Sequence, residues 1–296
     1  MKTIFKKPFL QEINYPDWNG KGVAVSVLRE DLVHPFICGN KWRKLKYNSI
    51  DFNGSGKKTL LTFGGAFSNH LIATAAFSSE NGINCIGIVR GEEIENDYLK
   101  FIKENGMKLH FISRSDYRNK NSKEFLTNIL NELIKKKLIK DPDDVFILPE
   151  GGSNTSAVHG ASEIMDEIPE SIDIIACACG TGATIGGISK KLLPHQKALG
   201  ISVLKSNGYF EKEIERLGGN LENIILNYDY HFGGYVKKNK ILLDFCDDFK
   251  LKTNIPIEPV YTGKLFFAIG DLIKNNYFKK GTKVTLIHTG GVFIFN

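Results

Sequence analysis

Short apolar runs alternate with helix-like stretches along most of this chain, and this alternation constrains its fold more than any other feature. Seven of the runs are almost free of charged side chains, which is typical of strands buried on both faces. They are TLLTFGG (59–65), NCIGIV (84–89), KLHFI (108–112), DVFILP (144–149), DIIACACG (173–180), ALGISVL (198–204) and KVTLIH (283–288). The pattern predicts an α/β protein in which helices cover both faces of parallel sheet.

The segments between the strands carry signals for the ends of helices. One predicted helix begins at Ser68, a good N-cap, and stops at Gly82, and another runs from about Glu93 to Gly106. No internal repeat, low-complexity segment or Gly/Ser/Pro linker interrupts the 296 residues. If the chain forms two domains, they must therefore be interwoven, with the chain crossing between them more than once.

The charge of the chain is modestly positive, with 39 Lys and Arg residues against 33 Asp and Glu residues. A nucleic-acid binder usually concentrates such charge on one stripe, whereas these lysines are spread out. The densest run, Lys135–Lys137, lies among apolar residues and is interpreted as the solvated face of a helix. No nucleic-acid partner is expected, and a modest positive field suits a small anionic cofactor or substrate.

The cysteines and the N-terminal segment indicate a cytoplasmic protein. Five cysteines, several of them in apolar runs, do not suggest a disulfide framework. Cys177 and Cys179 lack the spacing of a redox pair or a zinc knuckle, so they are interpreted as buried strand residues and no metal is expected. MKTIFKKPFL has no apolar core long enough for a signal peptide, and no stretch approaches the length of a membrane span.

Four glycine-rich junctions between strands and helices are candidate ligand sites, because ligands of open α/β sheets gather where strands end. They are GGAFSNH (64–70), PEGGSN (149–154), CGTGATIGG (179–187) and HTGG (288–291). Consecutive backbone N–H groups in GTGATIGG could bind a phosphate, although a plain tight turn has the same sequence. A nicotinamide-binding Rossmann protein has only this turn in its favour, since no acidic residue closes the next strand.

Two further segments carry groups suited to chemistry. Ser68 and Asn69 stand where a helix starts, so they could bind a carboxylate or an aromatic hydroxyl, or simply cap the helix. In GNKWRKLKYN (39–48), Lys41 and Lys44 share one face of a helix. They could be surface lysines, but an aldehyde cofactor needs a lysine for a Schiff base and a second cation for its phosphate.

Taken together, these segments with EPVYTGK and IHTGG resemble, in order, the motifs of the 1-aminocyclopropane-1-carboxylate deaminase and D-cysteine desulfhydrase family. The resemblance implies an α/β chain with the two interwoven three-layer domains of tryptophan-synthase-β-like (fold type II) pyridoxal-phosphate enzymes. A small domain is expected over 47–160, and a large cofactor-binding domain over 1–46 and 161–296. The resemblance also implies a pyridoxal-phosphate-dependent lyase that acts on a small amino acid and forms a homodimer.

By resemblance, Lys41 forms the Schiff base with pyridoxal 5′-phosphate and Lys44 pairs with the cofactor phosphate. Tyr235 in HFGGYVKKN and Tyr261 in EPVYTGK match two tyrosines that lie close to the substrate, although Tyr235 could instead be a packed aromatic residue. Whether Lys41 or a tyrosine takes the Cα proton stays open.

The remaining groups are assigned by the same resemblance. Asn69 would hydrogen-bond the pyridine 3-hydroxyl, and Ser68 with its neighbouring amides, followed by His70, would bind the substrate carboxylate. The turn expected to bind the phosphate through backbone amides consists of Gly180, Thr181, Gly182, Ala183 and Thr184.

Three residues distinguish the two activities of the family. The deaminases carry Glu and Leu where this chain has Thr262 and Thr289, and usually Gln where it has His70. A thiolate leaves readily, so a neutral hydroxyl beside the pyridine nitrogen suffices for β-elimination. We therefore expect pyruvate, ammonia and sulfide from D-cysteine, with 1-aminocyclopropane-1-carboxylate deamination as the competing hypothesis.

Two more functions are compatible with these motifs: a broader β-eliminase acting on D-serine or chloroalanine, and a catalytically silent ligand sensor. The joint retention of the motif lysines and tyrosines argues against the sensor. Two departures concern the substrate: Phe67 stands where both branches carry Gln, and Val292–Asn296 is expected to be a shortened final element.

Overall fold

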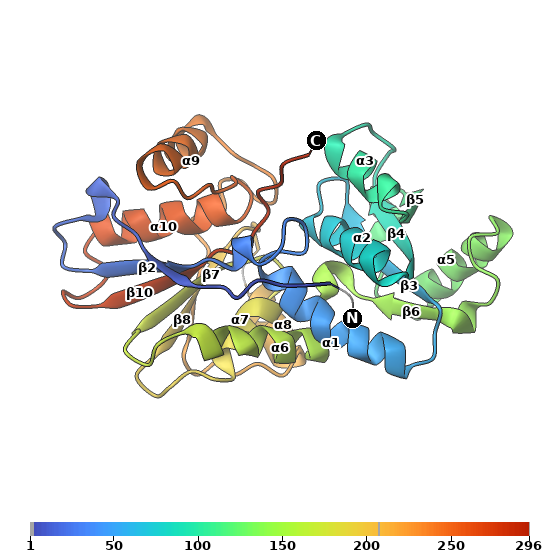
Figure 1. Cartoon of the computed structure of the whole chain (residues 1–296), viewed down its shortest axis with the longest axis horizontal. Coiled ribbons are helices and arrows are strands. Elements are labelled where there is room, and N and C mark those ends of the chain that lie inside the picture. The colour runs from blue at the N-terminus through green and yellow to red at the C-terminus, as the bar shows by residue number, and fades with distance from the viewer. Residues whose placement is uncertain (1–2, 207, 296) are drawn as a thin grey trace. The chain divides into compact units, whose positions relative to one another are not determined.

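The computed structural model describes residues 3–206 and 208–295, which form two compact units. Unit 1 consists of Leu45–Gly152 with the described residues 3–4 and 295, and unit 2 consists of Phe5–Lys44 and Ser153–Ile294. Figure 1 shows the elements of each unit. The domain division at 47 and 160 stays a prediction, which limited proteolysis with mapping of the stable fragments would test.

Unit 1 is built on a four-stranded parallel sheet in the order β5-β4-β3-β6. Its strands are β3 (Thr59–Gly65), β4 (Asn84–Arg90), β5 (Lys108–Ile112) and β6 (Val145–Leu148). Ile86 and Ile88 of β4 face a cluster that includes α5 (Lys123–Lys135), whereas Gly87 between them faces Leu71 of α2 (Asn69–Asn81). Helices therefore cover both faces of this sheet, and α3 (Asp97–Glu104) packs beside α2.

Unit 2 is built on a six-stranded sheet in the order β1-β2-β10-β7-β8-β9, in which only β1 runs antiparallel to its neighbour. The strands are β1 (Leu10–Glu12), β2 (Ala24–Leu28), β7 (Ile174–Cys179), β8 (Lys197–Ser202), β9 (Ile224–Asn227) and β10 (Lys283–Ile287). Ala176 and Ala178 of β7 face α9 (Lys240–Thr253) and α10 (Thr262–Lys274), and the alternate Ile175 and Cys177 face the opposite cluster. Helices α6 (Thr155–Ser162), α7 (Ala183–Ser189) and α8 (Tyr209–Arg216) lie on that opposite side (Figure 1).

The other helices are short or connect these layers. Helix α1 spans Asn40–Gly54 and α4 spans Arg114–Tyr117. Five 3₁₀ helices are Pro16–Trp18, Glu30–Leu32, Pro142–Asp144, Glu150–Gly152 and Glu163–Glu167.

All seven predicted strands are present, and β1, β2 and β9 are additional. Helix α2 has the predicted ends: the Ser68 hydroxyl accepts a hydrogen bond from the Leu71 N–H, and Gly82 adopts the left-handed conformation with φ of 68°. Helix α3 starts at Asp97, four residues later than predicted, because the Asn96 side chain caps it by accepting from the Leu99 N–H.

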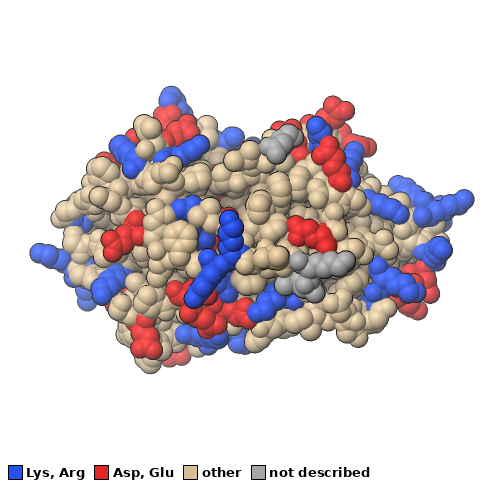
Figure 2. Space-filling view, in the orientation of Figure 1, with Lys and Arg blue, Asp and Glu red and all other residues tan. Residues whose placement is uncertain are grey.

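The surface drawn in Figure 2 carries Lys and Arg side chains interspersed with Asp and Glu, rather than a stripe of one sign. All five cysteines are buried free thiols. Within the described ranges, no helix combines the length and the apolar character that crossing a membrane requires.

Candidate active site

The start of α1 is fixed against the segment that follows β10. A Cβ atom on Gly39 would overlap the backbone carbonyl of Thr289, and one on Gly290 would overlap the Cys38 sulfur. Gly39 also has a left-handed φ of 61°, so only glycine fits there without strain. The GNK and HTGG motifs, about 250 positions apart in the sequence, therefore meet in unit 2.

Lys41 lies in the first turn of α1, and its amine donates a hydrogen bond to Asn40 Oδ1 at 2.8 Å. The other end of the same amide donates from Nδ2 to the Thr184 hydroxyl at 2.7 Å. Burial lowers the pKa of Lys41 to about 8, while Cys38 and the Glu258 carboxyl act in the opposite direction. A lysine in this state offers a neutral amine at much lower pH than an exposed lysine does.

Lys44 follows one turn later and is almost fully buried. Its pKa lies well below the ordinary value because of burial first and of the Lys41 charge second, against the influence of Cys177 and Cys179. Those two cysteines belong to the end of β7, so Lys44 lies close to the strand that leads into the glycine-rich turn. An anionic group bound there would offset the cost of two neighbouring buried lysines.

The glycine-rich turn runs from Gly180 into α7. Gly182 has a left-handed φ of 80° and precedes the helix, so the first amides of α7 have no cap from a side chain at that position. The Thr181 hydroxyl shares a hydrogen bond of 2.6 Å with Ser153 of the PEGGSN motif. The PEGGSN junction thus contacts the glycine-rich turn through Ser153, and Asn40 contacts it through Thr184.

The two candidate tyrosines lie next to each other. The rings of Tyr235 and Tyr261 meet edge to face with centroids 5.9 Å apart. A Cβ atom on Gly180 would come within 2.9 Å of the Tyr261 ring, so Tyr261 packs directly on the glycine-rich turn. The role of Tyr235 near the substrate stays a prediction, and its ring also packs against the core of unit 2. Its partner in that packing is the second candidate residue.

Glu258 organises the start of α10, a role that the sequence did not suggest. Its carboxylate accepts hydrogen bonds from the N–H groups of Val260, Tyr261 and Thr262 at 2.6 to 2.9 Å. Burial raises the pKa of Glu258 to about 7, and those hydrogen bonds act against the rise. This carboxyl therefore fixes the backbone that carries both Tyr261 and Thr262.

The Thr262 hydroxyl is buried and oriented by the same residue. It accepts a hydrogen bond from the Glu258 N–H at 2.9 Å and lies 3.3 Å from a carboxylate oxygen of Glu258. The Glu258 N–H occupies one lone pair, and the hydroxyl hydrogen, whose bond to the carboxylate is long, can turn toward another acceptor.

The HTGG segment is held by its histidine. His288 donates from Nε2 to the Pro256 carbonyl at 2.7 Å and accepts at Nδ1 from the Gly290 N–H at 3.3 Å, which selects one tautomer. Burial lowers the pKa of His288. A neutral histidine therefore holds the backbone beside Thr289.

The remaining candidates belong to unit 1. Ser68 caps α2, Asn69 is its first residue, and His70 is buried with its ring bonded to the Thr62 hydroxyl at 2.7 Å. The imidazole of His70 thus serves the interior of unit 1, and its predicted contact with substrate stays a prediction. Phe67 is 48% exposed and packs on Tyr98, which also contacts Phe295.

Unit 2 therefore assembles the predicted lysines, the turn, both tyrosines and both threonines, whereas Ser68, Asn69 and His70 lie in unit 1. No functional role followed from sequence for Asn40 of the GNK motif or for Glu258 and Lys264 of the EPVYTGK motif. Their position within GNK and EPVYTGK was the only signal that could have found them.

Comparison with known proteins identifies related chains. The profile of the family described as "Pyridoxal-phosphate dependent enzyme" matches residues 13–290. A Thermotoga maritima protein provisionally named 1-aminocyclopropane-1-carboxylate deaminase is 31% identical, over 92% of this chain and 90% of its own. An Arabidopsis thaliana protein named bifunctional D-cysteine desulfhydrase/1-aminocyclopropane-1-carboxylate deaminase, mitochondrial, is also 31% identical, over 92% of this chain and 73% of its own.

Solved structures agree with these relatives. The structure of an ACC deaminase homologue superposes with a TM-score of 0.78 at 27% identity, covering 97% of this chain and 90% of that one. A hydrogen sulfide-producing enzyme of Fusobacterium nucleatum shares the fold, with a TM-score of 0.67 at 18% identity, covering 96% of this chain and 94% of that one. These findings confirm the predicted fold class, the predicted family and pyridoxal 5′-phosphate as the cofactor.

Proposed function

Since this chain belongs to the family of pyridoxal-phosphate-dependent enzymes, we propose that it is a D-cysteine desulfhydrase-like lyase, which forms pyruvate, ammonia and sulfide. The observation that carries the choice of substrate is the neutral Thr262 hydroxyl, held by Glu258 at the start of α10. The resemblance assigns this position to the pyridine nitrogen of the cofactor.

The residues of unit 2 fit a phosphate-bearing aldehyde. Lys41 supplies an amine of lowered pKa, and Lys44 supplies a buried amine whose charged form a bound anion would favour. The turn Gly180–Thr184 leads into α7 beside them, with Gly180 lacking a side chain where Tyr261 packs. We assign covalent attachment to Lys41 and the phosphate to Lys44 and the turn.

Pyridoxal 5′-phosphate, when bound, withdraws electrons from the Cα atom of an amino acid and so makes the Cα proton acidic. Lys41 is suited to accept that proton because burial already favours its neutral amine. Asn40 restrains the amine through its 2.8 Å hydrogen bond, which limits the positions that the amine reaches.

The tyrosine pair offers a second route for protons. Tyr235 and Tyr261 are adjacent, and Glu258 fixes the backbone of Tyr261. Either phenol can hold or pass a proton, so the group that takes the Cα proton is assigned to Lys41 or to this pair.

The chemistry at Thr262 favours a good leaving group. A threonine hydroxyl can hydrogen-bond a ring nitrogen without giving it a full proton, which leaves a weaker electron sink than an acid would provide. Thiolate departure from cysteine needs only modest electron withdrawal, whereas opening a cyclopropane ring needs more. Thr289 supports the same choice, because it too is a small neutral residue.

A second candidate function is 1-aminocyclopropane-1-carboxylate deamination. It is favoured by the names of the relatives, since the Thermotoga protein carries only that name and the Arabidopsis protein carries both. Phe67 is a further reason to test both substrates, because an exposed phenyl ring stands next to Ser68 where both branches of the family carry the polar Gln.

We further propose that Ser68 and Asn69 bind the substrate carboxylate and the cofactor hydroxyl, as the resemblance implies, with His70 completing the site. The start of α2 supports this proposal, since helix N-termini favour anions. A homodimer in the cytoplasm is proposed on the same resemblance. Light scattering on the purified protein would measure the mass.

The decisive experiment is a substrate panel with the cofactor-loaded enzyme. D-Cysteine, L-cysteine, D-serine and 1-aminocyclopropane-1-carboxylate are compared by kcat/KM, with pyruvate and 2-oxobutyrate measured separately. We expect D-cysteine to be the best substrate. Faster formation of 2-oxobutyrate from the cyclopropane amino acid would overturn the proposal in favour of the deaminase.

A further inference from the structure

Lys264, three residues after Tyr261 on α10, has no exposed surface. Its ammonium donates hydrogen bonds to the carbonyls of Gly234 at 2.8 Å, His231 at 2.9 Å and Val203 at 3.4 Å. An ammonium has three N–H donors, so these bonds use all of them. Burying an ammonium is costly, which makes a purely space-filling role for this side chain implausible.

Two of the three carbonyls belong to an irregular loop. Phe232, Gly233, Gly234 and Val236 have positive φ angles of 51°, 92°, 118° and 64°. Two of these residues are not glycine, so the conformation carries strain that other interactions must offset. Within the loop, the Gly234 N–H donates to the His231 carbonyl at 2.9 Å, and that carbonyl also accepts from Lys264.

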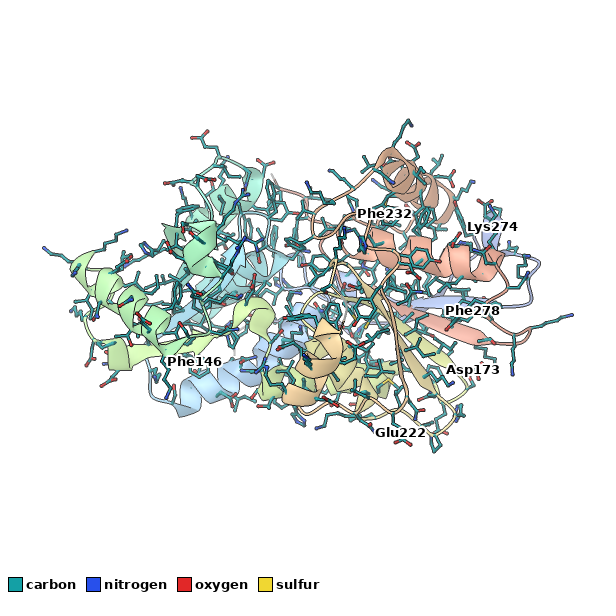
Figure 3. All side chains as sticks on the ribbon, turned by 180° about the vertical axis from the view of Figure 1, so that it is seen from behind. Phe146, Asp173, Glu222, Phe232, Lys274 and Phe278 are labelled. Carbon is teal, nitrogen blue, oxygen red and sulfur yellow. The ribbon has the colours of Figure 1, made fainter. Side chains whose placement is uncertain are left out.

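Tyr235 follows directly on Gly234, whose carbonyl Lys264 binds. The loop is also attached to α10 by Phe232, which is labelled in Figure 3 and packs edge to face on Phe267 at 5.1 Å. Tyr261 is the residue directly before α10, and the same helix, through Lys264 and Phe267, restrains the loop that carries Tyr235. The rings of the two tyrosines are in contact, with centroids 5.9 Å apart.

We propose that Lys264 is a positioning residue: its three hydrogen bonds hold the 231–234 backbone so that Tyr235 stays beside Tyr261. The catalytic part of this inference rests on the proposed function, which places both tyrosines near the substrate. The structural part does not, because the loop and its restraint exist without any cofactor.

The first test measures backbone order by amide hydrogen exchange on the full chain, with and without cofactor. Lys264→Met is expected to speed exchange in segment 231–237 by about tenfold or more, while β8 and the centre of α10 keep their rates. Lys264→Gln retains two N–H donors, so its exchange rate in segment 231–237 should lie between those of the parent protein and Lys264→Met. Lys57→Met is the matched control, because Lys57 donates to the Val145 carbonyl in unit 1 at 2.8 Å.

Uniform loss of protection throughout unit 2, or no change in 231–237, would overturn the proposal. The first result would make Lys264 a general stabilising residue, and the second would make its hydrogen bonds dispensable. Because Lys264→Gln preserves part of the network, the comparison survives if Lys264→Met folds poorly.

The second test is a double-mutant cycle with whichever amino acid the substrate panel identifies. If Lys264 acts through Tyr235, Lys264→Met lowers kcat by about tenfold in the parent enzyme and by less than about twofold in Tyr235→Phe. Equal losses in the two backgrounds would overturn the positioning role. A failure of D-cysteine turnover alone would contradict the proposed function and leave the exchange result standing.

Discussion

The side chain of Asn40 donates a hydrogen bond to the hydroxyl of Thr184 across 144 positions of sequence, at a distance of 2.7 Å. Its carbonyl oxygen accepts from Lys41 at 2.8 Å. One buried amide therefore joins the candidate attachment lysine to the turn assigned to the phosphate. The distance between these two parts of the site is set by a residue that touches both.

Replacing Asn40 with Ala should weaken cofactor binding by about 1–3 kcal/mol, because two buried hydrogen bonds are lost and their partners are left unsatisfied. Titration of cofactor-free protein with pyridoxal 5′-phosphate would measure the dissociation constant. Asn48→Ala is the control, since Asn48 is also a buried asparagine of α1 but bonds to Gly152 in unit 1. Equal weakening in both variants would contradict the bridging role.

Borohydride reduction of the loaded enzyme should attach the cofactor irreversibly to Lys41. The reason is that burial lowers the pKa of Lys41 to about 8, which makes a neutral amine available to form the Schiff base. Peptide mapping by mass spectrometry would locate the label. A label on Lys44, or none, would refute the assignment, and Lys46→Ala on the same helix should leave labelling unchanged.

The rate at which the cofactor attaches should rise with pH, and the midpoint of this rise should lie near pH 8. Only the neutral amine attacks an aldehyde, and burial moves the pKa of Lys41 down to about 8, so the reactive form predominates above that pH. Stopped-flow absorbance from pH 6.5 to 9.5 would follow the reaction at saturating cofactor. An ordinary lysine would still be gaining reactivity near pH 10. Since the Glu258 carboxylate raises this pKa, Glu258→Gln should move the midpoint to lower pH.

Gly180→Ala should reduce kcat about tenfold or more, because its methyl group would lie 2.9 Å from the Tyr261 ring and displace it. Steady-state kinetics, with cofactor occupancy checked by absorbance, would measure the loss. Gly54→Ala offers a matched control at the end of α1, where a Cβ atom would meet nothing within 4 Å. An active Gly180→Ala enzyme would show that the close packing of Tyr261 is unimportant.

Thr262→Glu combined with Thr289→Leu should lower elimination from D-cysteine and favour ring opening. An acidic partner makes the bound cofactor a stronger electron sink. The new carboxylate would lie beside the buried Glu258, so Thr262→Glu with Glu258→Gln separates electronic effects from repulsion. Pyruvate and 2-oxobutyrate are measured for each variant. If the unmodified protein already prefers the cyclopropane substrate, the argument from the threonines is wrong.

The strands that sequence predicted are those buried on both faces, such as β3 and β7, whose residues form continuous apolar runs. Two of the strands that it missed lack that signal: β1 has only three residues, and all four residues of β9 are half-buried. Strand β2 has the apolar sequence AVSVL and was missed although it carries the signal. Strand β2 contains Ser26, whose hydroxyl pairs with Thr285 of β10. That pairing exists only once the sheet has formed.

The same distinction applies to the site. Lys41, Lys44 and the glycine-rich turn carry their chemistry in residue type and spacing, so sequence alone could nominate them. The roles of Asn40 and Lys264 depend on hydrogen-bond partners that lie 144 and about 30 positions away in the sequence. No local sequence pattern indicates such long-range contacts. His70 was nominated by its place in the GGAFSNH motif, but its ring bonds to Thr62 inside unit 1, a contact that the motif does not indicate.

The position of β10 in its sheet determines when the surroundings of Lys41 can form during synthesis of the chain. This strand, the last in the described sequence, lies between β2 and β7, and the segment after it locks against Gly39. A ribosome therefore exposes Lys41 nearly 250 residues before its immediate surroundings can form. The sheet of unit 1, by contrast, is complete once Leu148 has emerged. A growing chain can fold its first sheet early, yet the surroundings of Lys41 are complete only after β10 and the HTGG segment have emerged.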